Sequence, residues 1–272
     1  MIPAPFEYEV AESVEHAIEL LGSGDDAKLL AGGHSLLPLM KLRFSRPSLL
    51  VDIGRLPLDH VREDGDEIAI GALARHHELA ADPLLAAQCP IVPRAAAQIG
   101  DRQVRHRGTI GGSVAHADPA GDLPSVLLAL DATFVAHGPD GERRIAASDF
   151  FRGVFETALG PRELLTEVRV PKVPAGAYVK FVRRAQDWAT VGVAAVRDGS
   201  VRVALTHMAP TPVRARGVED ALASGADAGA AAERADEGTE PVSDASASAD
   251  FRRHLAQVLV RRALEELEAA NR

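Results

Sequence analysis

Residues 31–35, Ala-Gly-Gly-His-Ser, join a short predicted strand to a predicted helix, and this junction decides how the start of the chain folds. The strand covers Lys28–Ala31, and the helix runs from Leu36 to Phe44. Because glycine reaches positive φ at little cost, two glycines in a row let successive backbone N–H groups point at one anion. A helix that begins directly after such a loop adds the positive end of its dipole. The stretch therefore predicts either a phosphate site or an ordinary tight turn.

A second pair of glycines lies in residues 109–113, Thr-Ile-Gly-Gly-Ser, between a basic segment and a polar one. The basic segment holds Arg94, Arg102, Arg105 and Arg107, offset only by Asp101. The polar segment, residues 117–124, offers two carboxylates. One of them, Asp122, could accept hydrogen bonds from ribityl or ribose hydroxyls, or could cap the helix predicted over Leu123–Leu130. These two roles are compatible.

The two glycine pairs alone do not decide between these interpretations. With 23 glycines among 272 residues, chance gives about two such pairs, which is the number observed. Neither pair fits the dinucleotide fingerprint G-x-G-x-x-G, and no Walker lysine pattern accompanies them. The flanking residues therefore carry the specificity.

Composition excludes several classes of protein. The net charge of -9 argues against a nucleic-acid binder, whose surface is usually basic. No uninterrupted apolar stretch reaches the ~18 residues of a membrane span, and the start lacks a secretory signal, so we expect a cytoplasmic protein. The single cysteine, Cys89, excludes an internal disulfide and an iron–sulfur or cysteine-rich zinc site held by this chain alone. His76 and His77 are adjacent on a predicted helix and point to different faces, so no metal site is predicted.

Hydrophobic periodicity divides the chain into three units, residues 1–57, 58–163 and 164–272. The first is a small α/β unit with a helix over Ser13–Leu21 and a buried strand over Leu49–Ile53. The second opens with a hairpin at the Asp64-Gly65 turn and continues with short helices.

The third unit is predicted to begin with four consecutive antiparallel strands. These strands cover residues 165–170, 177–182, 191–196 and 201–207. Residues 221–250, rich in Ala, Ser, Asp and Glu, predict either a poorly packed helix or a mobile connector. A last amphipathic helix is predicted over Ala249–Ala269 and should dock on this unit.

The flanks of both glycine pairs resemble two motifs of one family, the FAD-binding medium subunits of molybdenum hydroxylases of the carbon monoxide dehydrogenase and xanthine dehydrogenase type. The likeness runs through residues 31–43 and through residues 99–119. It continues at residues 178–181 and 251–255, so it spans nearly the whole chain. The cysteine-rich insertion that one variant of the family carries is absent here.

The resemblance implies an α+β fold of the vanillyl-alcohol oxidase (PCMH) type. Two small α/β subdomains would grip FAD, and a C-terminal antiparallel sheet with helices would follow. The glycine stretches would bind the pyrophosphate, Ile99 and Gly100 would lie near the isoalloxazine ring, Asp122 near the ribityl or ribose region, and Lys180 would be a further flavin contact. The residues so placed at the cofactor are Ala31, Gly32, Gly33, His34, Ser35, Leu36, Ile99, Gly100, Thr109, Gly111, Gly112, Ser113, Asp122 and Lys180.

The same resemblance implies a role in electron transfer. A molybdenum-cofactor large subunit would oxidise the substrate, and a small [2Fe–2S] subunit would pass electrons to this flavin and on to an external acceptor. A heterotrimer dimerised to a hexamer is expected. No residue of this chain is assigned as a general acid, general base or metal ligand. A self-contained flavin oxidoreductase, or a nucleotide-binding assembly module without turnover, stays open as an alternative.

Overall fold

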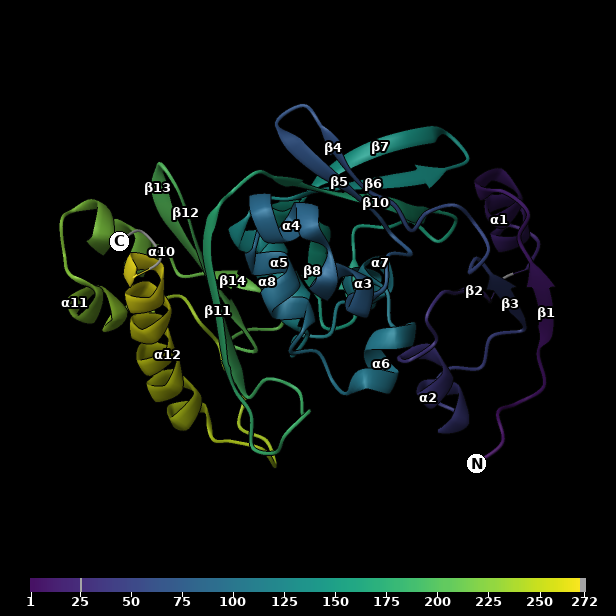
Figure 1. Cartoon of the computed structure of the whole chain (residues 1–272). Helices are drawn as coiled ribbons and strands as arrows, with labels where there is room; N and C mark the ends of the chain where they lie inside the picture. The colour runs from purple at the N-terminus through teal and green to yellow at the C-terminus, as the bar shows by residue number, and fades with distance from the viewer. Residues whose placement is uncertain (25, 270–272) are drawn as a thin grey trace.

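The computed structural model describes residues 1–24 and 26–269, which fold into three units in a row (Figure 1). The N-terminal unit is a parallel sheet in the order β1-β3-β2 with two helices. Its elements are β1 (Glu7–Val10), α1 (Val14–Leu21), β2 (Ala27–Leu30), α2 (Leu36–Lys41) and β3 (Leu49–Asp52). Ser13 caps α1 by accepting from the backbone N–H of His16 at 3.1 Å, as predicted. Helix α2 ends at Lys41 instead of Phe44, because Arg43 adopts a left-handed φ of 62°.

The middle unit is a five-stranded sheet in the order β4-β5-β10-β6-β7. Its strands are β4 (Val61–Asp64), β5 (Glu67–Gly71), β6 (Thr133–Gly138), β7 (Gly141–Ala146) and β10 (Leu164–Pro171). Its helices are α3 (His76–Ala81), α4 (Pro83–Gln88), α5 (Ile91–Ala96), α6 (Arg102–Arg107), α7 (Ile110–His116), α8 (Asp122–Ala129) and α9 (Ala147–Phe150), and a small hairpin of β8 (Phe151–Gly153) and β9 (Glu156–Thr157) follows. Ile68, Phe134 and Val168 cover one sheet face and bury against these helices.

The hairpin predicted at Asp64-Gly65 is confirmed, with Gly65 at φ 63°. The prediction that residues 165–170 open the C-terminal sheet is wrong. Strand β10 pairs with β5 and β6 instead, and Arg169 on it forms ion pairs with Asp64 and Glu67 at 2.5 and 2.7 Å. Alternating hydrophobicity predicts a strand but not its neighbours, because packing elsewhere in the chain selects them. We therefore place the domain boundary after Pro171 instead of at residue 164.

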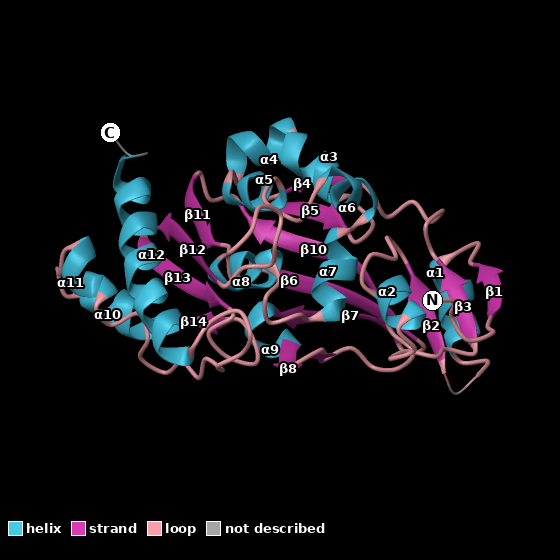
Figure 2. Cartoon of the chain, turned by 90° about the horizontal axis from the view of Figure 1, so that it is seen from below, coloured by secondary structure: helices cyan, strands magenta, loops and turns pink. Residues whose placement is uncertain are grey.

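The C-terminal unit is an antiparallel sheet, β11-β12-β13-β14, between two layers of helix (Figure 2). It comprises β11 (Ala175–Phe181), β12 (Val191–Asp198), β13 (Ser200–Thr206), β14 (Val213–Arg214), α10 (Arg216–Ala223), α11 (Ala228–Ala232) and α12 (Ala249–Ala269). Alternate residues of β12 face opposite ways: Val193 packs in the cluster that includes α12, and Ala194 packs in the cluster that includes α8. Helix α8 thus joins the middle unit to this sheet.

The alanine-rich residues 221–250 include the end of α10 and all of α11. Ala231, Ala232 and Ala235 are buried, so small side chains let these turns pack closely against α12. The connector interpretation is wrong for this part of the segment. Among the residues described, no helix combines the length and apolar character that crossing a bilayer requires.

Candidate functional site

The first glycine stretch lies against the backbone that directly precedes the second, although residues 36–106 lie between these two segments in sequence. A Cβ on Gly32 would lie 2.2 Å from the carbonyl oxygen of Arg107 and 2.9 Å from Cα of Gly108. No side chain fits there, so only glycine lets the first stretch touch the backbone that leads into the second. Two segments that are distant in sequence therefore lie against each other in the fold.

The first stretch presents unpaired backbone donors. Gly33 has φ 77°, in the left-handed region that favours glycine. In the described part of the chain, none of the four N–H groups from Gly32 to Ser35 donates to a protein acceptor. Ser35 precedes α2 but makes no side-chain cap bond, so its hydroxyl has no helical partner. Unpaired N–H groups beside a glycine of positive φ are what an anion nest requires, and the phosphate site here stays a prediction.

The second stretch has a different structure from the one predicted. Helix α7 begins at Ile110, inside the stretch, with Thr109 as its N-cap accepting from Gly112 N–H at 3.1 Å. The N–H groups of Ile110 and Gly111 bond to the carbonyls of Ala74 and Ala72. Gly111 and Gly112 are helical and do not have positive φ, so the nest interpretation is wrong here.

Close packing explains the need for glycine in the second stretch. A Cβ on Gly111 would lie 2.5 Å from Cβ of Ala72 and 2.7 Å from its carbonyl oxygen. Gly112 is exposed, and Ser113 is half-buried. The backbone N–H of Ser113 donates to the carbonyl of Thr109 at 3.0 Å, and its hydroxyl makes no hydrogen bond to the described residues. The second stretch therefore presents side-chain hydroxyl groups and an exposed glycine backbone at the start of a helix. The first stretch presents backbone N–H donors.

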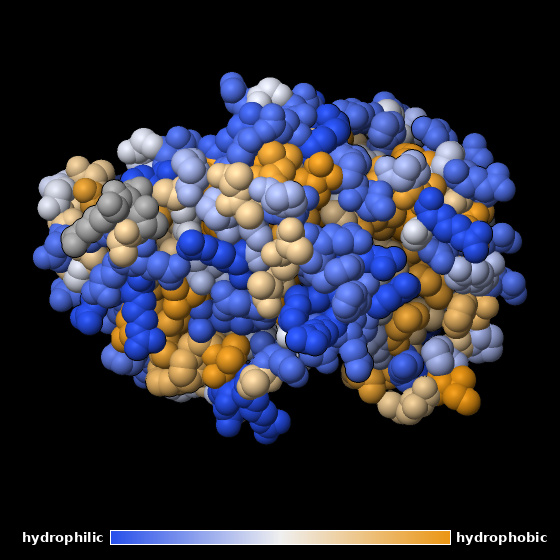
Figure 3. Space-filling model, viewed as in Figure 1, coloured by the Kyte–Doolittle hydropathy of each residue, from blue (hydrophilic) through white to orange (hydrophobic). Residues whose placement is uncertain are grey.

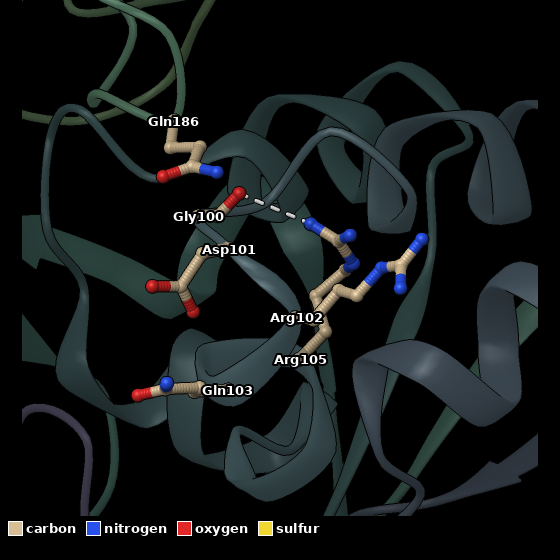
Figure 4. A pocket seen from close by; sticks show the side chains of 6 residues that line it. All are labelled: Gly100, Asp101, Arg102, Gln103, Arg105 and Gln186. Atoms are coloured by element: carbon tan, nitrogen blue, oxygen red, sulfur yellow. Dashed lines mark hydrogen bonds between the residues drawn. The ribbon is translucent and has the colours of Figure 1, made fainter.

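Ile99 and Gly100 form a turn between α5 and α6. Gly100 has φ 46°, and Asp101 caps α6 by accepting from Val104 N–H at 2.8 Å. One guanidinium nitrogen of Arg105 donates to the carbonyls of Ile99 and Gly100, at 2.8 and 3.0 Å. The turn borders an open pocket of about 420 Å³ (Figure 4), lined by Gly100, Asp101, Arg102, Gln103, Arg105 and Gln186.

Asp122 and Lys180 form a buried ion pair, 3.0 Å apart, between α8 and β11. Asp122 is the first residue of α8, and Gly121 holds the N-cap position, so the capping role predicted for Asp122 is wrong. Its carboxylate accepts from the Tyr178 hydroxyl at 2.5 Å. Burial raises the pKa of Asp122, against the lowering by Lys180, and burial followed by Asp122 raises the pKa of Tyr178 well above its ordinary value.

Lys180 also donates to the carbonyl of Gln98 at 2.8 Å, which connects the ion pair to the turn at Ile99 and Gly100. The structure thus brings these four predicted residues into one neighbourhood. The four arginines of the basic segment do not form a cluster. Arg94 bonds Gly176 and Glu266, for example, while Arg102 is exposed at the pocket.

His76 lies in this region, although the sequence analysis considered it only as a candidate metal ligand. It is only 4% exposed, and its ring packs against Gly108, where a Cβ would lie 2.8 Å from its Cδ2. Its Nδ1 is buried without a hydrogen-bond partner in the described residues. Burial, then Arg105 and His34, lowers its pKa to about 4, so the ring is neutral at physiological pH. Among the residues described, no group of three or more His, Cys, Asp or Glu could hold a metal ion.

Comparison with known families assigns both parts of the chain. Residues 4–173 match the FAD-binding domain in molybdopterin dehydrogenase, and residues 176–267 match the C-terminal domain of CO dehydrogenase flavoproteins. This chain belongs to the molybdopterin dehydrogenase FAD-binding family. Its cofactor is FAD, and it is an oxidoreductase subunit.

Relatives match this FAD-binding chain over its whole length. It is 44% identical to the carbon monoxide dehydrogenase medium chain of Hydrogenophaga pseudoflava, over 97% of both chains. It is 43% identical to subunit alpha of the 6-hydroxypseudooxynicotine dehydrogenase complex of Paenarthrobacter nicotinovorans, over 97% of this chain and 95% of that one.

Two solved structures share the fold. Carbon monoxide dehydrogenase from Hydrogenophaga pseudoflava aligns with a TM-score of 0.95 at 44% identity, over 99% of both chains. Quinoline 2-oxidoreductase from Pseudomonas putida 86 aligns with a TM-score of 0.94 at 33% identity, also over 99% of both. The predicted fold class and family are confirmed.

Proposed function

We propose that this chain is the electron outlet of a molybdenum-containing hydroxylase or dehydrogenase complex. It would hold FAD, receive electrons from the [2Fe–2S] clusters of a small partner subunit, and release them to an external acceptor. The observation that carries this proposal is the full-length likeness to medium chains, and the close approach of Gly32 to the backbone before the second glycine stretch supports it. When bound, FAD supplies the redox chemistry, and the protein positions it.

The residues present fit a dinucleotide. In the proposed arrangement, the free N–H groups of Gly32, Gly33, His34 and Ser35 bind pyrophosphate oxygens, as does the start of α7 through Thr109 and Ser113. Ile99 and Gly100 lie along the isoalloxazine ring. Asp122 and Lys180 are paired with each other and buried. In this arrangement they support the turn at Ile99 and Gly100 more than they contact the flavin directly. Ala31, Leu36, Gly111 and Gly112 shape the backbone around the ligand.

We propose that the substrate is recognised by a different subunit. Relatives 34–44% identical to this chain carry names that refer to carbon monoxide, 6-hydroxypseudooxynicotine, glyceraldehyde, nicotine and caffeine. Chains that remain alike across such different compounds are expected to perform a shared task, and electron transfer is such a task. The molybdenum large subunit, the [2Fe–2S] small subunit and the dimerised heterotrimer stay predictions, as does a cytoplasmic location.

Purification from the native host tests the proposal. We expect this chain to co-purify with two partners, with FAD, iron and molybdenum in a ratio of about 1:4:1, as two [2Fe–2S] clusters require. Fractionation of the same cells tests the location. A yellow chain that turns over a substrate alone would favour the self-contained oxidoreductase. A purified chain without a flavin band, even after FAD is added, would favour the assembly module and contradict the proposal.

A further inference from the structure

Two cationic side chains hold three successive backbone carbonyls in the turn between α5 and α6. Lys180 donates to the carbonyl of Gln98 at 2.8 Å. Arg105 donates to the next two, of Ile99 and Gly100, at 2.8 and 3.0 Å. Hydrogen bonds from charged donors are about twice as strong as neutral ones. This turn is therefore held more firmly than an ordinary loop of its length.

The fixed carbonyls determine where the adjacent N–H groups point. Every peptide bond described is trans, so each N–H is directed opposite to the carbonyl of the same peptide unit. Since the carbonyls of Ile99 and Gly100 face Arg105, the N–H groups of Gly100 and Asp101 point away from it. Neither N–H has a protein acceptor in the described part of the chain. Both residues line the pocket shown in Figure 4.

The glycine is part of this arrangement. Gly100 has φ 46°, and a Cβ there would lie 3.0 to 3.2 Å from three side-chain carbons of Val104. Adjacent N–H groups in such a turn form a concave pair that accepts an electron-rich atom. The carboxylate of Asp101 does not compete for this space, because it is bonded to Val104 N–H at 2.8 Å.

We propose that Arg105 is a positioning residue that locks the turn so that the N–H groups of Gly100 and Asp101 donate to an electron-rich oxygen or nitrogen of the flavin ring. This inference rests on the proposed function, which places Ile99 and Gly100 along the ring. The reduced ring carries more negative charge than the oxidised ring. A pair of N–H donors that Arg105 holds in place therefore stabilises the reduced flavin more than the oxidised flavin. This difference raises the midpoint potential of the flavin.

The experiment uses the full chain loaded with FAD, and the variants Arg105→Gln, Arg105→Lys and Arg94→Gln. Arg94 is the matched control, because it also donates to a backbone carbonyl, that of Gly176 at 2.9 Å, but is not among the residues that line the pocket. The measurements are FAD affinity from flavin fluorescence, midpoint potential by dye equilibration, and hydrogen exchange of residues 98–101 in the unliganded chain.

We expect Arg105→Gln to weaken FAD binding about tenfold and to shift the midpoint potential to a more negative value. Arg105→Lys should recover at least half of that shift. Arg94→Gln should change the FAD affinity by less than about twofold and leave the midpoint potential unchanged. Exchange should rise at residues 98–101 and stay unchanged elsewhere. The potential is the decisive measurement, because damage confined to the pyrophosphate site would weaken both redox forms equally and leave the potential unchanged.

The outcomes separate this inference from the proposed function. A wild-type chain that does not bind FAD would contradict the proposed function. A wild-type chain that binds FAD, with an unchanged potential in Arg105→Gln, would overturn the role of Arg105 alone. If the Gln variant does not retain FAD, Arg105→Lys and hydrogen exchange decide: exchange that rises throughout the chain overturns the inference, and a rise confined to the turn supports it.

Discussion

The two glycine stretches carry the same Gly-Gly pair for different physical reasons. In the first stretch, Gly33 adopts φ 77°, and four successive N–H groups have no acceptor among the residues that the structure describes. In the second, Gly111 is helical and its N–H is bonded to Ala72. The first pair is required by backbone conformation and by contact with Arg107 and Gly108, which precede the second stretch. The second pair is required by packing alone.

This difference shows that a glycine motif does not define a single geometry. A nest supplies donors, whereas a helix start supplies a cap hydroxyl, a dipole and space for close approach. The contact of Gly32 with Arg107 and Gly108 brings the two stretches close together, as the proposed FAD site requires. Substitutions in the two stretches should therefore lower stability and FAD affinity for different physical reasons.

The largest effect is expected where a side chain would meet backbone. Gly32→Ala places a methyl 2.2 Å from the carbonyl oxygen of Arg107, and backbone cannot swing aside as a flexible side chain can. We expect a loss of about 3 kcal/mol in the free energy of unfolding, together with loss of FAD. Denaturant unfolding measures it. Gly24→Ala is the control, since the nearest atom to a Cβ there is 3.9 Å away. Equal stability of the two variants would refute the close contact of Gly32 with Arg107 and Gly108.

The next effect concerns His76, which is buried against Gly108, just before the second stretch. The pKa of His76 is lowered from 6.5 to about 4 in the folded chain. As the pH falls below 6.5, the unfolded chain binds a proton that the folded chain does not, so folding loses stability. We expect His76 to account for about 2 kcal/mol of lost stability between pH 7 and pH 5.

Unfolding of the wild type and of His76→Leu at several pH values tests this expectation. The wild type should lose stability more steeply than the variant as the solution is acidified, with the two curves parallel above pH 7. Parallel curves from pH 7 down to pH 5 would show that His76 titrates normally and is not buried as described.

Local sequence patterns predict some features of this chain and not others. Periodicity and turn residues predicted α1, α12 and the hairpin at Asp64-Gly65, because local signals determine such elements. The motif flanks predicted the family. Burial of a polar side chain has no such local signal. Arg252 resembles a surface charge in the sequence, yet it is fully buried and bonds to Asp244 and to the carbonyl of Val242.

The second limit concerns partners distant in sequence. The start of α7 at Ile110 was missed because glycines disfavour helix interiors, and here tertiary contacts with Ala72 and Ala74 override that preference. The contacts of Arg105 and Lys180 with one turn were missed for the same reason. The resemblance placed Ile99, Gly100 and Lys180 near one cofactor. Only the structure shows that Lys180 binds the carbonyl of Gln98, next to Ile99 in the same turn.

A smaller effect is expected from Gly33→Ala, which tests the backbone conformation of the first stretch. It should cost about 1 kcal/mol of stability, because alanine is strained at φ 77° and its Cβ would lie 2.9 Å from Cδ1 of Leu37, a flexible side chain that can move aside. It should weaken FAD binding more than tenfold if the N–H groups form the phosphate site. Gly65→Ala is the matched control: φ is 63°, nothing lies within 4 Å, and the turn belongs to a distant hairpin. A similar loss of FAD in both variants would mean that the affinity follows stability and not the nest.

The smallest effect isolates the cap of the second stretch. The Thr109 hydroxyl accepts from Gly112 N–H at 3.1 Å, so Thr109→Ala should cost about 1 kcal/mol, while Thr109→Ser should stay close to wild type. Thermal unfolding measures both variants. Because the hydroxyl can still donate its own hydrogen, the Ala variant should also weaken FAD binding, and the Ser variant should not. A Ser variant as weak as the Ala variant would mean that the methyl group of Thr109, and not its hydroxyl, shapes this end of the site.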